Sequence, residues 1–361
     1  MQSRRRWRYG FVISGLFLGV AQPVFAQSAF DQLVEASRHE MAKKEGRLSV
    51  ATEIEDRLVT PVLKAFQKDL PFIRDITYER LNTAEVQHRI LLQTMQGRKP
   101  NYDVMHVAQE LWPDYIKADL FAKPLFEYKR LAKELPRDWA ELDVRIIDPE
   151  GYFMATAGLA RGIVWSPNLV PKGKEPTSWE ACLDPMWKGK FLYDPRPKLT
   201  GLWYDPKTRE SHIQWLKGIV HNGVVLSRQQ SANLEKVAAG EFPLFCGVNY
   251  HSAMPVIDGG APLQFAFPDP IPLEFGSVIH VLKYSKAPAT TQLLALWLGS
   301  KGQEAMDRYA YRGFPWNPKS RKYPLAKGKY VAICDAKCVS GLDSYDKIHA
   351  EILKLPGAKA R

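Results

Sequence analysis

After residue 20 the sequence has no apolar stretch long enough to span a membrane, so the rest of the chain is expected to be soluble. The apolar run at 11–20 follows four arginines and precedes the small residues Val24 and Ala26. This order is typical of a cleavable secretory signal peptide. No cysteine lies at the expected cleavage point between Ala26 and Gln27, which argues against a lipid anchor. The predicted location is the periplasm.

Cysteine is scarce, with four residues in 361. Cys334 and Cys338 lie close together in the segment ICDAKC, and in an exported chain this spacing predicts a small-loop disulfide worth roughly 2 kcal/mol. No further metal ligands stand near them, so a zinc site is not expected. Cys182 and Cys246 are expected to be buried thiols rather than a second bridge.

Clusters of basic residues are also missing. The predicted leader holds four arginines and no acidic residue, so the 50 Lys and Arg of the chain fall to 46 against 39 Asp and Glu, a net charge of +7. An excess of this size slightly favours an anionic ligand. Without a Lys/Arg block or a stripe of alternating basic and aromatic residues, nucleic acid is not an expected partner.

Catalytic motifs are missing as well, so an enzyme is not expected. The sequence contains no Gly-x-Ser-x-Gly motif, no phosphate-binding loop and no dinucleotide fingerprint after a predicted strand. His39-Glu40 is followed by Lys43 where a zinc protease motif needs its second histidine. His106 lies within a predicted strand and is interpreted as a core histidine. No cofactor is expected.

Hydrophobic periodicity predicts alternating strands and helices over the first 120 residues. The expected helices are 28–44, 58–70, one from the capping box of Asn82 and Glu85 to Gly97, and 110–118, and the expected strands are 48–52, 76–81 and 102–107. This alternation is typical of a parallel sheet with helices on both faces.

Two long extended runs, near 152–160 and 264–280, bracket about 110 residues with an α/β pattern of their own. Within this span the periodicity predicts helices at 205–220 and 232–239 and a buried strand at 242–250, and a terminal helix is expected at 345–355. The pattern indicates one domain inserted into another. The predicted division is a signal peptide at 1–26, a first lobe at 27–157 and 274–361, and an inserted second lobe at 158–273.

Five segments carry a resemblance to a known family. They are TEIEDRLVTPVLKAFQKDLP (52–71), YDVMHV (102–107), TSWEACLDPMWKGKFLYDP (177–195), GEFPLFCGVNYH (240–251) and APATTQLLALWLGSKGQEAMDRYAYRGFPWNP (287–318). In this order along the chain, they resemble bacterial extracellular solute-binding proteins of ABC importers. The resemblance covers roughly 45–350 and is greatest to the branch with ferric-iron, thiamine, polyamine and aminoethylphosphonate binders.

The resemblance implies a type II periplasmic binding protein fold, an α/β architecture of two lobes joined by two crossing strands with a ligand cleft between them. It also implies a function. The protein would capture a small solute, such as an organic anion or a phosphonate, by closing its lobes, and would deliver it to an ABC permease in the inner membrane. A monomer is expected. The tryptophans of 177–195 are interpreted as packing anchors.

Ligands of open α/β sheets bind beyond the carboxyl ends of the strands, where free N–H groups of helix N-termini point into the crevice. Applied to this sequence, the rule predicts binding residues after the strands of both lobes. They are Thr52, Glu53, Gln109 and Glu110 in the first lobe, and Arg161, Thr200, Gly201, Trp203, Asn249, Tyr250 and His251 in the second.

Three other functions stay open at this stage. In ferric-iron binders of the family, two adjacent tyrosines occupy the positions of Tyr250 and His251, and a glutamate stands where this chain has Ala108. Fe(III) prefers phenolate and carboxylate oxygens, so a site with Tyr250 and His251 would be a poorer one for iron. The ligand-binding module of a sensor would use the same cleft, and a periplasmic hydrolase is the remaining alternative.

Overall fold

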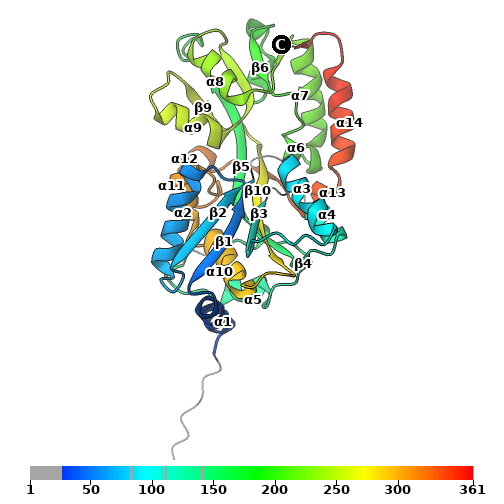
Figure 1. Ribbon diagram of the computed structural model, residues 1–361. Helices are drawn as coiled ribbons and strands as arrows, with labels where there is room; N and C mark the ends of the chain where they lie inside the picture. Colours follow the sequence, from blue (N-terminus) through cyan, green and yellow to red (C-terminus); the bar gives the residue numbers. More distant parts are fainter. Residues whose placement is uncertain (1–26, 82–83, 108, 110–111, 140–141, 361) are drawn as a thin grey trace, which may run out of the picture.

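The computed structural model describes residues 27–81, 84–107, 109, 112–139 and 142–360 (Figure 1). The predicted signal peptide, the predicted helix start at Asn82 and the candidate Glu110 lie outside these residues. The strands are β1 (Arg47–Thr52), β2 (Asp75–Arg80), β3 (Val104–Val107), β4 (Phe121–Ala122), β5 (Phe153–Trp165), β6 (Phe191–Tyr193), β7 (Val225–Leu226), β8 (Leu244–Asn249), β9 (Gln264–Ala266), β10 (Ile271–Leu282), β11 (Val331–Cys334) and β12 (Lys359–Ala360).

Helices cover both faces of the strands, as the alternating pattern predicts. They are α1 (Ala29–Lys43), α2 (Asp56–Asp69), α3 (Ala84–Met95), α4 (Trp112–Lys117), α5 (Tyr128–Lys133), α6 (Thr200–Tyr204), α7 (Arg209–His221), α8 (Gln230–Ala238), α9 (Tyr250–Asp258), α10 (Pro288–Gly299), α11 (Gln303–Ala310), α12 (Tyr323–Ala326), α13 (Ala336–Ser340) and α14 (Leu342–Leu353). The apolar face predicted for α2 is buried, with Phe66 against Trp297 of α10.

The strands form one mixed sheet with the order β12-β7-β6-β8-β5-β10-β3-β1-β2. β1 is parallel to β2 and β3, and β6 is parallel to β7 and β8, so each half of the sheet has the parallel core that the sequence pattern predicts. Figure 1 shows the two halves as two lobes, with β5 running from one to the other.

Strand β5 joins the lobes because its two ends have different partners. Residues 153–160 pair with β10, and residues 161–165 pair with β8. A second crossing is made by the short connection from β9 to β10, since β9 pairs with β5 in one lobe and β10 pairs with β3 in the other. The two crossings expected from the long extended runs are therefore present.

The C-terminal segment differs from the predicted division. Helix α14 packs against α7, and the Tyr345 hydroxyl lies 2.9 Å from His212 Nε2. Strand β12 pairs with β7. These contacts attach residues 342–360 to the inserted lobe. The prediction from the sequence placed 274–361 in the first lobe. An amphipathic pattern predicts a helix but does not indicate which surface the helix packs on. The other boundaries stay a prediction.

Segment 177–195 packs as predicted. It forms two short 3₁₀ turns at Glu180–Leu183 and Pro185–Trp187 and then enters β6. Trp179 and Trp187 are buried in the core of the inserted lobe, and Trp179 Nε1 donates a hydrogen bond of 2.9 Å to the Pro270 carbonyl. The tryptophans are therefore packing anchors, and Trp179 also fixes this lobe to the start of β10.

The cysteine pairing is predicted correctly in one case and incorrectly in the other. Cys334 and Cys338 form a disulfide. Cys182 and Cys246, expected as thiols, form a second disulfide between residues 64 positions apart. This pairing could not be predicted from the sequence, because the two cysteines come together only when the turn at 180–183 packs against β8. Both are fully buried.

Candidate functional site

A cavity of ≈ 420 Å³ lies between the two lobes. Residues after β1 and β3 line it from the first lobe, and residues of β5, β8, α6 and α9 line it from the inserted lobe. Six predicted residues are among those at its wall: Glu53, Gln109, Arg161, Thr200, Asn249 and His251. Arg161 lies within β5 rather than after a strand, and the binding of a ligand by these six residues stays a prediction.

Four other candidates lie elsewhere. Thr52 is fully buried, and its Oγ1 lies 3.1 Å from His106 Nδ1 in the core. Gly201 allows α6 to approach β11, because a Cβ at this position would lie 2.0 Å from the Ala332 carbonyl oxygen. Trp203 stacks on Tyr345. Tyr250 is buried against Phe267. None of these four residues is among those that line the cavity.

His106 is a core histidine, as predicted. Its Nε2 lies 2.6 Å from Thr156 Oγ1, and burial lowers its pKa to about 3. The ring is therefore neutral and joins β1, β3 and β5 through two threonine hydroxyls.

Charged side chains that the sequence analysis missed also line the cavity. They are Arg196, Lys198, Glu274, Arg312 and Asp346. Arg196 and Lys198 follow β6 in the same loop as Thr200, so the strand-end rule could have included them. Arg312 and Asp346 come from C-terminal segments that the rule does not cover.

Two part-buried ion pairs line the cavity, and this part of its wall is called the floor. Arg161 Nη2 lies 3.3 Å from Glu274 Oε2, and Thr200 Oγ1 donates a hydrogen bond of 2.9 Å to the other oxygen of the same carboxylate. Arg312 Nη1 lies 2.9 Å from Glu53 Oε1, which also accepts from the Ser277 hydroxyl at 2.6 Å. Each arginine is thus held in place by a carboxylate from β10 or from the end of β1.

Several buried polar atoms around this floor have no hydrogen-bond partner within the described residues. The donors are Arg161 Nε, Arg161 Nη1 and Arg312 Nε, and the carbonyl acceptors are Gln109 Oε1 and Asn249 Oδ1. His251 Nδ1 is also unpaired. An unsatisfied buried polar atom costs about 1–3 kcal/mol, so this arrangement favours a polar ligand that supplies the missing partners.

The ring of His251 is neutral. Burial lowers its pKa well below the usual value, and the nearby cations Arg312, Arg161 and Lys322 lower it further. Four cationic side chains and three carboxylates line the cavity, so with His251 neutral the net charge is +1. This charge and the unpaired guanidinium N–H groups favour an anionic group on the ligand.

Lys322 supports the loop that carries Arg312. Its side chain is fully buried, and its Nζ donates hydrogen bonds of 2.7 Å to the carbonyls of Tyr311 and Gly313. Burial lowers the pKa of Lys322 to about 7, although the carboxylate of Asp307 at 3.8 Å opposes this shift. This buried lysine therefore holds the backbone on both sides of Arg312, a charged residue of the cavity.

Because the pKa of Lys322 is lowered in the folded protein, the free energy of unfolding is expected to increase with pH. Between pH 7 and about 10 the unfolded chain keeps the proton on Lys322 while the folded chain does not, so unfolding becomes less favourable as pH rises. Relative to Lys322→Met, the wild type is expected to gain roughly 1 kcal/mol per pH unit above pH 7. Urea unfolding at pH 7, 8 and 9 measures this difference. The exposed Lys319→Met is the control, and parallel curves for wild type and Lys322→Met would contradict the expectation.

Within the described ranges, no group of three or more His, Cys, Asp or Glu side chains is placed to hold a metal ion. Burial raises the pKa of the Tyr250 phenol, which disfavours the phenolate that Fe(III) prefers, and Tyr250 is not at the cavity wall.

The family model described as bacterial extracellular solute-binding protein matches residues 62–329. The comparison with curated protein sequences found no significant match. No described helix has the length and apolar character required to cross a membrane.

Solved structures share the fold at low sequence identity. Iron-bound HitA from Pseudomonas aeruginosa is 16% identical, with a TM-score of 0.62 over 85% of this chain and 99% of that chain. The substrate binding protein of an ABC transporter from Agrobacterium tumefaciens is 16% identical, with a TM-score of 0.63 over 84% of this chain and 95% of that chain. An ABC transporter structure from Clostridium perfringens is 18% identical, with a TM-score of 0.61 over 85% of this chain and all of that chain.

These similarities confirm the predicted type II periplasmic binding protein fold. Sequence identities of this size show only that the fold is shared. The ligand of this chain has to be inferred from its own residues. The family match is independent of them and spans most of the chain. The protein is therefore a member of the bacterial extracellular solute-binding protein family.

Proposed function

We propose that this protein is the solute-binding component of an ABC transporter and captures a small organic anion between its two lobes. The observation that carries the proposal is the pair of arginines in the cavity, Arg161 and Arg312. Each pairs with a carboxylate, but Arg161 Nε and Nη1 and Arg312 Nε are buried and have no partner in the described residues. Carboxylate, phosphate and phosphonate oxygens accept such hydrogen bonds in the planar geometry that guanidinium groups offer.

The ligand would also donate hydrogen bonds. Gln109 Oε1 of the first lobe and Asn249 Oδ1 of the inserted lobe are buried acceptors without a partner. A solute with hydroxyl or amino groups beside its anionic group would satisfy atoms from both lobes at once. Such a solute stabilises the closed form by the contacts that only this form provides.

The proposed mechanism is closure of the lobes around the solute, followed by docking on a membrane permease. Periplasmic binding proteins are an established example of such hinge closure. A micromolar dissociation constant corresponds to about 8 kcal/mol, which a few charge-assisted hydrogen bonds and some apolar burial can supply. The solute would leave the protein chemically unchanged.

A periplasmic location is part of the proposal. The family is extracellular, and the four cysteines of the chain form two disulfides. Disulfides form and persist in oxidising compartments such as the periplasm, which supports export of the mature protein.

Titration with three anions tests the proposal. The mature protein is titrated by calorimetry with inorganic phosphate, methylphosphonate and succinate, and mass spectrometry identifies any solute that co-purifies with it. We expect saturable binding of at least one anion and a smaller radius of gyration in its presence. If none of the three binds and the co-purified solute is a cation or a metal ion, the assignment to organic anions is wrong.

A further inference from the structure

The C-terminal segment 331–353 connects the two lobes a third time, in addition to β5 and the β9–β10 connection. It begins as β11, which pairs with β10 through residues 331–334. It ends as α14, where His349 Nε2 lies 3.1 Å from the Tyr193 hydroxyl of the inserted lobe. The match to the family model stops at residue 329, just before this segment.

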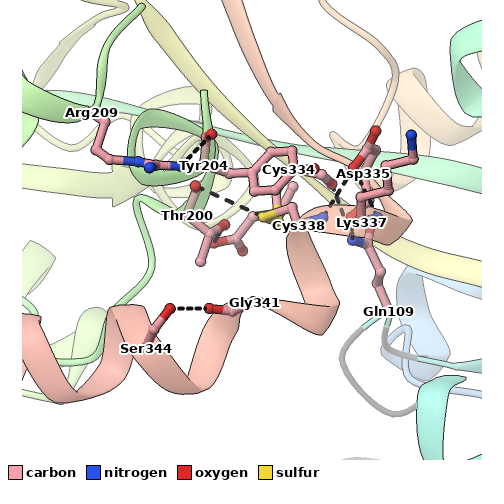
Figure 2. The surroundings of a disulfide bond; sticks show 11 residues. Gln109, Thr200, Tyr204, Arg209, Cys334, Asp335, Lys337, Cys338, Gly341 and Ser344 are labelled. Carbon is pink, nitrogen blue, oxygen red and sulfur yellow. Dashed lines mark hydrogen bonds between the residues drawn. A yellow bond between two sulfur atoms is a disulfide. The ribbon is translucent and has the colours of Figure 1, made fainter. Parts of the chain in front are cut away.

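The disulfide turn 334–338 follows β11, whose Ala332 already packs on α6 of the inserted lobe, and Figure 2 shows the residues around this turn. From the first lobe, Gln109 Nε2 donates hydrogen bonds of 3.0 and 3.1 Å to the carbonyls of Cys334 and Asp335. From the inserted lobe, the Thr200 carbonyl oxygen lies 3.9 Å from Cys338 Sγ, which is a packing contact because a disulfide sulfur carries no hydrogen to donate. The turn therefore contacts a cavity residue of each lobe.

Both contacted residues are connected to the unpaired atoms of the cavity. Gln109 uses its amide nitrogen on the turn, and this fixes the orientation of its unpaired carbonyl oxygen. Thr200 donates its hydroxyl to Glu274, which in turn holds Arg161. A shift of the turn would therefore displace the Gln109 carbonyl oxygen in the first lobe and change the packing against Thr200 in the inserted lobe.

The disulfide constrains this turn together with the Asp335 cap and the hydrogen bonds from Gln109. Helix α13 has five residues, and a helix of this length is not stable by itself in water. Its N-terminus is capped by the Asp335 carboxylate, which accepts from the amides of Lys337 and Cys338. The Cys334–Cys338 bridge closes the turn 334–338. It keeps the Cys334 and Asp335 carbonyls directed at Gln109 (Figure 2).

We propose that Cys334 and Cys338 are positioning residues of the solute cleft: the turn that they close ties Gln109 to Thr200 and sets the spacing of the lobes in the unliganded protein. This inference rests on the proposed function only for its effect on affinity, because the spacing of the lobes can be measured without a ligand.

The test compares two disulfide variants of the mature protein. In Cys334→Ser/Cys338→Ser, small-angle scattering without ligand is expected to give a larger radius of gyration than in the wild type. The affinity for whichever of phosphate, methylphosphonate and succinate binds the wild type most tightly is expected to fall roughly tenfold, the loss expected from about 1.4 kcal/mol of hydrogen bonding. Cys182→Ser/Cys246→Ser is the matched control. It removes a disulfide outside the cavity wall and is expected to change neither quantity under conditions where circular dichroism shows that the variant is folded.

A double-mutant cycle separates positioning from a general loss of structure. Gln109→Leu keeps the disulfide but removes the contact to the turn, so we expect the same larger radius and a similar loss of affinity. Combining it with Cys334→Ser/Cys338→Ser is expected to add little, because both changes break one contact. If the serine variant does not fold, Gln109→Leu alone decides the outcome.

Two results would overturn the inference. One is an unchanged radius of gyration in both Gln109→Leu and Cys334→Ser/Cys338→Ser. The other is a fully additive loss of affinity in the cycle. If no anion binds the wild type, the proposed ligand class fails, and the scattering data still decide whether the disulfide sets the spacing of the lobes.

Discussion

Arg161→Met is expected to lower the affinity for the captured anion by roughly 100-fold, or about 3 kcal/mol. Arg161 is buried on β5, and two of its guanidinium nitrogens have no partner in the described structure. Methionine has a similar length and keeps the packing, but it donates no hydrogen bond. Calorimetric titration with the anion that binds the wild type most tightly measures the loss.

A second variant separates this effect from instability. Arg161→Met by itself leaves Glu274 without its cation, and breaking a buried ion pair in this way costs about 3–5 kcal/mol when both groups are fully buried. Arg161→Met/Glu274→Gln removes both charges, so we expect stability to recover while the affinity stays low. Arg57→Met, in an exposed ion pair with Glu55, is the control. Wild-type affinity in the double variant would show that Arg161 does not bind the anion.

Loss of the Cys182–Cys246 disulfide is expected to give the largest loss of stability. The bridge closes a loop of 64 residues, and chain entropy assigns roughly 4 kcal/mol to a loop of this length. The loop contains β6, α6, α7, β7 and α8, which is most of the inserted lobe. Cys182→Ser/Cys246→Ser is therefore expected to unfold at a clearly lower urea concentration than the wild type.

The short disulfide provides the comparison for this measurement. Cys334 and Cys338 are separated by 4 positions, and the same entropy argument assigns roughly 2 kcal/mol to their bridge. Urea unfolding of the two serine variants under the same conditions is expected to rank them in this order. The reverse order would mean that strain or residual structure, rather than loop length, dominates at these sites.

The helices and strands were largely predictable, because each depends on a pattern within a short window. Burial along α2 follows the spacing of Val59, Val62, Leu63 and Phe66. β8 is a continuous apolar run and is buried along its whole length. The inserted topology was also predictable, since two long extended runs bracket an α/β pattern. Local periodicity determines such features before any tertiary contact forms.

The cavity was predictable in position but only partly in composition. The strand-end rule identifies the residues that follow a strand, and Glu53, Gln109 and Asn249 line the cavity accordingly. The rule does not give the direction of a side chain. Tyr250 begins α9 and packs inward on Phe267, and Thr52 points into the core toward His106. These directions depend on which neighbours leave space for the side chain.

Sequence alone determined the class of the fold, the two lobes and the general place of the cleft, because these follow from periodicity and from the polarity of strand ends. Only the tertiary structure decided that Cys182 pairs with Cys246, that Arg312 and Asp346 reach the cavity, and that α14 lies on the inserted lobe. Each of these contacts joins residues far apart in the chain, and their proximity depends on how the lobes and the C-terminal segment pack together.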